Sequence, residues 1–197
     1  MFPAFLKLSG RPVVLVGGGR VAAGKLEALI AEGALVTVVA PEIVQEIERR
    51  EGLTVLRRAF EPADLDGAWW VVAAAPPEVN REVLAAAEAR RIFVNAVDDP
   101  QHATAYAGGV VRRDDVTIAI STNGRAPALA GLLREALDVW LPRDLGRWMT
   151  AADEARRSWK DQGVPMEHRR PLLLETLNRL YEDNSQRPTS NSQTPSR

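Results

Sequence analysis

The chain of 197 residues is long enough for one α/β domain with a smaller appendage, and its 46% hydrophobic content can fill an ordinary core. Its 25 lysines and arginines are balanced by 26 acidic residues, so the composition lacks the basic excess typical of nucleic-acid-binding proteins. The sequence has no apolar run near the ~20 residues of a membrane-spanning helix, no recognisable signal peptide and no cysteine for disulfides or thiolate metal sites, which together predict a soluble cytoplasmic protein.

The first half of the chain alternates segments typical of strands and helices. Short apolar runs predict five strands, at residues 13–16, 35–39, 53–56, 69–74 and 92–95. Helical patterns lie between them at residues 22–30, 43–50 and 77–90, and Gly33 is placed to end the first. Apolar strands separated by helices predict a parallel sheet covered on both faces, an α/β fold of the Rossmann type.

The second half of the chain, beyond Asp98, has a different pattern. It predicts a hairpin and three amphipathic helices, at residues 110–120, 127–141, 145–159 and 173–181. The last residues lack large apolar side chains and cannot bury enough surface to offset the cost of ordering. We expect a Rossmann domain at 1–112, a hairpin-and-helix segment at 113–143, a helical domain at 144–183 and a disordered tail at 184–197.

A glycine-rich turn joins the first strand to the first helix. Gly17-x-Gly19-x-x-Ala22 follows a predicted strand and opens a predicted helix, the context in which this motif binds dinucleotides. The first glycine allows a tight turn, the second lets a pyrophosphate approach the backbone, and the small residue at 22 lets the helix pack closely. The phosphates would lie on the helix N-terminus, at the amides of Arg20 and Val21. The alternative is a turn that needs glycine for its shape alone.

The end of the second strand is where a Rossmann domain handles the adenine ribose. Pro41 and Glu42 stand just beyond it, and no arginine adjoins the strand end to bind a 2′-phosphate, which favours NAD over NADP. Glu42 could equally complement the dipole of a following helix. The expected cofactor-binding residues are Gly17, Gly18, Gly19, Arg20, Val21, Pro41 and Glu42.

Three motifs in sequence order carry a family resemblance. They are Val-Gly-Gly-Gly-Arg-Val-Ala-x-x-Lys at residues 16–25 with Val-Val-Ala-Pro at 38–41, Asn-Ala-Val-Asp-Asp-Pro at 95–100, and Ile-Ala-Ile-Ser-Thr-Asn-Gly-Arg-Ala-Pro-Ala-Leu-Ala at 118–130. From about residue 3 to about residue 180, the chain resembles the precorrin-2 dehydrogenase and siroheme synthase N-terminal module family. Some members of that family also chelate iron.

The resemblance implies both an architecture and a reaction. The architecture is a Rossmann domain, a small dimerisation segment and a helical C-terminal domain, assembled as a homodimer. The reaction is NAD-dependent oxidation of the tetrapyrrole precorrin-2 to sirohydrochlorin. The resemblance further implies that Asp98 is catalytic, and that the substrate contacts Ser121, Thr122, Asn123, Gly124 and Arg125.

Two departures from the family pattern concern the substrate side. Ala126 stands where the family has serine, just before Pro127 at the expected first helical position. Losing a serine N-cap costs on the order of 1 kcal/mol of helix stability, and it also removes a hydroxyl from the pocket. Residues 105–109 replace a more aromatic, proline-containing stretch of the family.

Asp98 lies just past the carboxyl end of the fifth predicted strand, the edge where open parallel sheets bind ligands. A carboxylate there could accept a proton while hydride leaves, but Asp98 and Asp99 before Pro100 are also typical turn residues. The resemblance favours the catalytic interpretation for Asp98 and leaves Asp99 as a turn residue. No cysteine, lysine or histidine close in sequence offers a competing base.

Other polar and aromatic residues carry weaker predictions. The two histidines, His102 and His168, have no second ligand at metal-binding spacing, so we expect surface or helix-end positions and no metal site. Four arginines are candidates for pairing with substrate carboxylates, Arg125 first among them, followed by Arg112, Arg113 and Arg134. Trp140, Trp148 and Trp159 lie on apolar stripes that predict core packing or a dimer interface.

Two alternative functions stay open at the level of sequence. A Rossmann domain could sense NAD without catalysis, because fold does not fix function. The chain could also combine dehydrogenase and ferrochelatase activities. The hairpin and the helix at 127–141 are too small to fold alone, so we expect a second copy to bury their apolar stripe.

Overall fold

The first five strands form one parallel sheet in the computed structural model, which describes residues 1–185, with side chains to residue 180. The strands lie in the order β3-β2-β1-β4-β5 and comprise β1 (Pro12–Val16), β2 (Leu35–Val39), β3 (Thr54–Leu56), β4 (Trp70–Ala73) and β5 (Val94–Ala96). The chain runs outward from β1 in both directions, so the order reverses between β1 and β4. In a sheet of this kind the ligand crevice lies at the carboxyl ends of those two strands.

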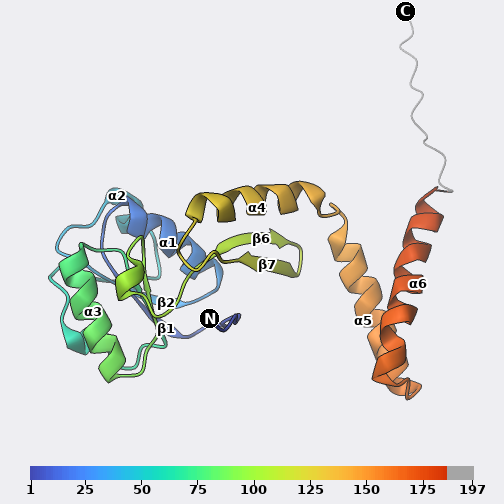
Figure 1. Ribbon diagram of the computed structural model, residues 1–197. Coiled ribbons are helices and arrows are strands. Elements are labelled where there is room, and N and C mark those ends of the chain that lie inside the picture. Colours follow the sequence, from blue (N-terminus) through green and yellow to red (C-terminus); the bar gives the residue numbers. More distant parts are fainter. Residues whose placement is uncertain (186–197) are drawn as a thin grey trace, which may run out of the picture. The chain divides into compact units, whose positions relative to one another are not determined.

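Both faces of the sheet are covered, as the sequence predicts (Figure 1). Odd-numbered residues of β1 belong to a core cluster that includes α1 (Arg20–Ala31) and α2 (Gln45–Glu48). Even-numbered residues belong to a second cluster that includes α3 (Pro77–Ala89) and the short 3-10 turn η1 (Pro62–Leu65). The two-residue period of the strand therefore divides one apolar run between two cores. The Rossmann-type α/β prediction is confirmed.

Several element boundaries differ from the sequence prediction. At two of them, a backbone contact competes with regular structure. The N–H of Ile92 donates to the carbonyl of Ala87 at 2.9 Å, and Arg91 adopts φ +60°. These residues therefore end α3 rather than begin β5. The N–H of Val44 donates to the carbonyl of Gly18 at 2.8 Å, which shortens α2 and ties its start to the glycine turn.

The rest of the chain contains an antiparallel hairpin and three helices. β6 (Gly109–Arg113) pairs with β7 (Val116–Ile120), and α4 (Pro127–Trp140), α5 (Leu145–Asp161) and α6 (Met166–Ser185) follow. Helices α5 and α6 pack against each other (Figure 1). The disordered tail expected from residue 184 lies outside the described residues from residue 186 onward.

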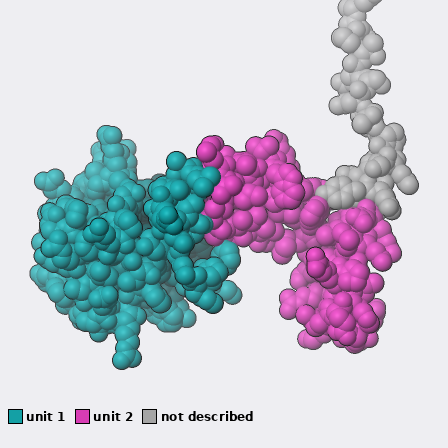
Figure 2. Space-filling model, in the orientation of Figure 1, with its two compact units in different colours: residues 1–108, 121–130 teal, residues 109–120, 131–197 magenta. Residues whose placement is uncertain are grey.

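The chain divides into two compact units (Figure 2). The first contains Met1–Gly108 together with Ser121–Ala130, and the second contains Gly109–Ile120 and the residues after Ala130. The domain boundaries expected at 112, 143 and 183 stay predictions. Within the described part of the chain, none of the helices has the length and apolar character needed to span a bilayer.

Candidate dinucleotide and substrate site

The glycine turn after β1 is shaped by two close backbone approaches. Gly17 has φ +123°, and a Cβ there would lie 2.3 Å from the carbonyl oxygen of Ala74, just past β4. A Cβ on Gly18 would lie 1.9 Å from the carbonyl oxygen of Glu42, just past β2. Side chains at either position would collide with fixed backbone, so the packing of three neighbouring strand ends requires both glycines. The sequence motif indicated the need at Gly17, whereas the need at Gly18 depends on a contact that local sequence does not show.

Gly19 meets no such contact and leaves an open cradle. It precedes α1 with φ −86° and ψ −174°, and no atom lies within 4 Å of the position its Cβ would occupy. The amides of the first helical turn have no acceptor within the helix, and Arg20 and Val21 at its start are exposed. No acidic side chain occupies that turn. A helix N-terminus that is open and free of carboxylates fits a pyrophosphate.

The carboxyl end of β2 carries the two residues expected at the adenine ribose. Pro41 and Glu42 are both exposed there, following the buried Ala40. The neighbouring β3 ends in two arginines that are already engaged, since Arg57 pairs with Glu48 and Arg58 pairs with Asp64. Neither pair has a local sequence signal, because each closes a loop rather than continuing a helix or strand.

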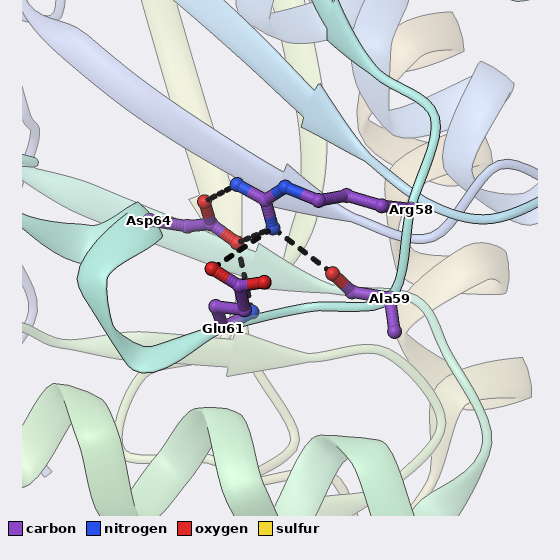
Figure 3. Close-up of polar contacts among 4 residues, drawn as sticks. All are labelled: Arg58, Ala59, Glu61 and Asp64. Atoms are coloured by element: carbon purple, nitrogen blue, oxygen red, sulfur yellow. Dashed lines mark hydrogen bonds and ion pairs between the residues drawn. The ribbon is translucent and has the colours of Figure 1, made fainter.

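The Arg58–Asp64 pair fixes the loop after β3 (Figure 3). Asp64 has a side chain only 4% exposed and also accepts the N–H of Glu61 at 2.8 Å. The hydrogen bond from Arg58, aided by that of Glu61, lowers the pKa of Asp64 despite the opposing effect of burial. The carboxylate is therefore ionised at neutral pH and holds the Arg58 guanidinium in place.

Asp98 lies two residues beyond β5, at the same edge of the sheet as the glycine turn. The N–H of Val97 donates to the carbonyl of Ala73 at 2.8 Å, so the ladder with β4 continues up to Asp98. Asp98 itself is exposed and has φ +56°, in the left-handed region that aspartate and asparagine tolerate best among residues with a side chain. Strained backbone of this kind is concentrated at functional sites.

Asp99 is more than the turn residue that the sequence predicts. It does start a 3-10 turn, η2 (Pro100–His102), but its carboxylate also accepts hydrogen bonds from Asn80 and His102. His102 occupies a helix end, as expected, yet its side chain is only 17% exposed. A histidine is thus tied to the residue that follows Asp98. Local sequence does not indicate this contact, because it depends on the shape of the turn.

The Ser121–Arg125 loop packs against the segment that follows Asp98, within the first compact unit. A Cβ on Gly124 would lie 3.2 Å from Cε1 of Tyr106 and 3.5 Å from Cβ of Pro100. The structure therefore brings the third motif to the second one, although 24 positions separate Gly124 from Pro100. Arg125 in this loop is exposed.

Backbone contacts fix the shape of the same loop. Ser121 Oγ accepts the N–H of Asn123 at 3.2 Å, and Thr122 Oγ1 accepts the N–H of Ala126 at 3.3 Å. Asn123 and Gly124 adopt φ +57° and +72°. Ala126 does take the N-cap position, because its carbonyl accepts the N–H of Ala130. The Thr122 hydroxyl binds the N–H of Ala126 itself and not the N–H groups of the first turn of α4, which a serine at the N-cap would bind.

The other candidate arginines have partners within the protein. Arg113 donates to the carbonyls of Asp138 and Leu141 and to the carboxylate of Asp138. Its guanidinium therefore caps the C-terminal end of α4. Arg134 pairs with the neighbouring Glu135. Arg112 is exposed on β6.

The three tryptophans on the apolar helical stripes differ in exposure. Trp148 and Trp159 on α5 are half-buried, which agrees with packing inside the helical part. Trp140 at the end of α4 is 79% exposed and belongs to an apolar surface instead.

Two protein families, several curated proteins and a solved structure are similar to this chain. The family described as putative NAD(P)-binding matches residues 4–109, more than half of the chain, and the sirohaem biosynthesis protein central family matches residues 113–138. The chain belongs to the precorrin-2 dehydrogenase and siroheme synthase N-terminal module family. Residues 4–109 thus form a nicotinamide-dinucleotide-binding domain.

Individual relatives agree with this assignment. The chain is 39% identical over 180 residues to a siroheme synthase of Photorhabdus laumondii and 41% identical over 172 residues to siroheme synthase 3 of Aeromonas hydrophila. These alignments cover 89% and 85% of the chain but only 38% and 37% of the relatives. Among solved structures, SirC, precorrin-2 dehydrogenase, superposes with a TM-score of 0.66 at 27% identity, covering 89% of this chain and 88% of that one.

Proposed function

We propose that the chain oxidises precorrin-2 to sirohydrochlorin with NAD as the hydride acceptor. The solved relative whose length the chain nearly spans is a precorrin-2 dehydrogenase, and the curated siroheme synthases share the same segment. Both point to the same substrate class, a tetrapyrrole rich in carboxylates. A cytoplasmic location stays a prediction from the sequence.

The observation that carries the proposal is the convergence of three motifs in one compact unit. The open cradle at Gly19 and the strained Asp98 stand at the carboxyl edge of the same parallel sheet, and the loop containing Gly124 packs on the turn after Asp98. A domain that only sensed NAD would need the cradle but not a carboxylate and a second loop beside it. The arrangement therefore favours catalysis over sensing.

The chemistry requires the loss of one hydride and one proton from the reduced macrocycle. NAD supplies the hydride acceptor when it is bound. Asp98 is exposed, so its carboxylate is accessible to a substrate and can accept the proton from the carbon next to the one that loses hydride. Arg125 lies exposed in the neighbouring loop, and we propose that it pairs with a substrate carboxylate.

The same structure favours NAD over NADP. Glu42 is exposed just past β2, and its carboxylate would repel a 2′-phosphate. The two arginines at the end of the adjoining strand, Arg57 and Arg58, are held by Glu48 and Asp64. Oxidation rates with NAD and with NADP, measured side by side, test this preference.

An anaerobic assay with precorrin-2 tests the proposed reaction. The chain and NAD should convert precorrin-2 to sirohydrochlorin in step with NADH formation, both followed by absorbance. NAD binding without turnover would support the sensing alternative. A parallel assay with ferrous ion and sirohydrochlorin tests ferrochelation. Among the described residues, no group of three or more His, Asp or Glu side chains is arranged to hold a metal ion.

We further propose that α4 forms the interface of a homodimer. Leu132, Val139 and Trp140 of this helix are 64%, 88% and 79% exposed, and Leu133 is 43% exposed. Large apolar side chains gathered on one helix are typical of a surface that a partner covers. A second copy would present the same helix, as a two-fold interface requires.

A further inference from the structure

Asn80 is a buried polar residue on the otherwise apolar inner side of α3. It is 1% exposed and lies near the core formed by Val83 and Ala87. A buried amide is costly unless its donor and acceptor are both used. Its Oδ1 accepts the N–H of Ala75 at 3.3 Å, and its Nδ2 donates to Oδ2 of Asp99 at 3.1 Å. Asn80 therefore joins the end of β4 to the turn that follows β5.

The Asp99 carboxylate is held from a second direction by His102. Nδ1 of His102 lies 2.8 Å from both carboxylate oxygens, and the backbone N–H of His102 donates to the Asp99 carbonyl at 3.1 Å. Because an ionised carboxylate only accepts, Nδ1 carries the proton in this contact. Burial alone would raise the pKa of Asp99, but the hydrogen bonds from Asn80 and His102 and the charge of His102 outweigh it and lower the pKa. Asp99 is thus an ionised anchor.

These contacts fix the backbone on one side of Asp98, and β4 fixes it on the other. The N–H of Val97 is bound to the carbonyl of Ala73, and Asp99 is bound to Asn80 and His102. A left-handed residue keeps its conformation only where its surroundings overdetermine it. Asp98, with φ +56°, is flanked on both sides by such constraints.

We propose that Asn80, Asp99 and His102 form a positioning network that holds Asp98 in its reactive orientation, on the basis of the function proposed above. None of the three needs to touch the substrate. Their effect passes through the backbone of the turn, and a small displacement of a reacting group can cost up to about 10²-fold in rate. The network predicts that His102 matters for turnover only while Asp98 has its carboxylate.

A double-mutant cycle on the anaerobic precorrin-2 assay tests this dependence. His102→Leu removes the donor to Asp99 and should lower kcat by roughly 10- to 100-fold, with the Kd for NAD unchanged. His102→Asn, whose amide can donate in place of Nδ1, should recover most of the rate. In an Asp98→Asn background, His102→Leu should cause no further loss, because there is no carboxylate left to position.

The matched control is His168→Leu, since His168 is the other histidine and is exposed on α6. It should leave kcat unchanged. Thermal melting reports whether each variant is folded, and His102→Ala removes the same donor in the same cycle if His102→Leu unfolds below the assay temperature.

The outcomes separate the two proposals. Equal losses from His102→Leu in the presence and absence of the Asp98 carboxylate would overturn the positioning network while leaving the dehydrogenase intact. A wild-type kcat for His102→Leu would likewise overturn the positioning network and leave the dehydrogenase intact. Full activity of Asp98→Asn alone would instead remove the catalytic role of Asp98, and with it the basis of the network.

Discussion

Replacing Gly19 with valine should separate the cofactor site from the stability of the fold. Gly19 has extended backbone angles that any residue can adopt, and its Cβ position is open to 4 Å. Exchanging glycine for an apolar residue at a helix N-cap costs about 0.5–1 kcal/mol. In a chain of this size that loss lowers the Tm by roughly 1–4 °C. The variant should therefore fold.

Binding of NAD should suffer much more than folding. The valine side chain would fill the cradle through which a pyrophosphate reaches the amides of Arg20 and Val21. Losing one hydrogen bond to a charged group costs about 1.5–3 kcal/mol. That loss corresponds to a rise in the Kd for NAD of roughly 10- to 150-fold.

Titration calorimetry with NAD measures this effect, and Gly24→Val is the matched control. Gly24 lies further along the same helix and also has open space at its Cβ position. Its variant should bind NAD as the wild type does. A wild-type Kd for folded Gly19→Val would show that the pyrophosphate does not lie on this turn. If NAD binding is weakened equally in Gly19→Val and Gly24→Val, the effect comes from the helix as a whole and not from the turn.

Four further predictions concern catalysis, folding and assembly. Asp98→Asn keeps a side chain suited to φ +56° but loses the proton acceptor. The kcat should therefore fall by about 10²- to 10⁴-fold with the Kd for NAD unchanged, and a change in kcat smaller than about 10-fold would refute the role of Asp98 as a general base. Gly17→Ala should destabilise the fold by more than about 2 kcal/mol in urea unfolding, since its Cβ would lie 2.3 Å from a backbone oxygen at φ +123°. The pKa of Asp64 is lowered by Arg58, so the stability from this pair is fully present above the unfolded pKa of about 4 and is lost as the pH falls through the folded value. The gap in unfolding free energy between wild type and Asp64→Asn should accordingly narrow from pH 7 to pH 3, and a constant gap would contradict the assignment. Trp140→Glu should yield monomers in sedimentation at concentrations where the wild type is dimeric, and an unchanged dimer would exclude this part of α4 from the interface.

The sequence by itself determined the elements whose signals are local. The two-residue period of β1 and the three-to-four-residue period of α1 depend on neighbours in the chain, so apolar spacing was enough to predict them. The glycine turn was predicted for the same reason, because a strand, a glycine with positive φ and a helix N-terminus are consecutive. The position of Asp98 at the ligand edge followed from the strand that precedes it.

Only the tertiary structure decided which groups meet across distant parts of the chain. Gly18 must be glycine because the strand pairing brings the carbonyl of Glu42 to it. Asn80 reaches Asp99 across 19 positions, and Arg113 reaches Asp138 across 25, so no window of local sequence contains either pair. Hydrogen bonds carry no periodic signature along the chain and depend on the fold to bring donor and acceptor within about 3 Å. For that reason the residues around Asp98 became visible only once the sheet and its connecting turns were in place.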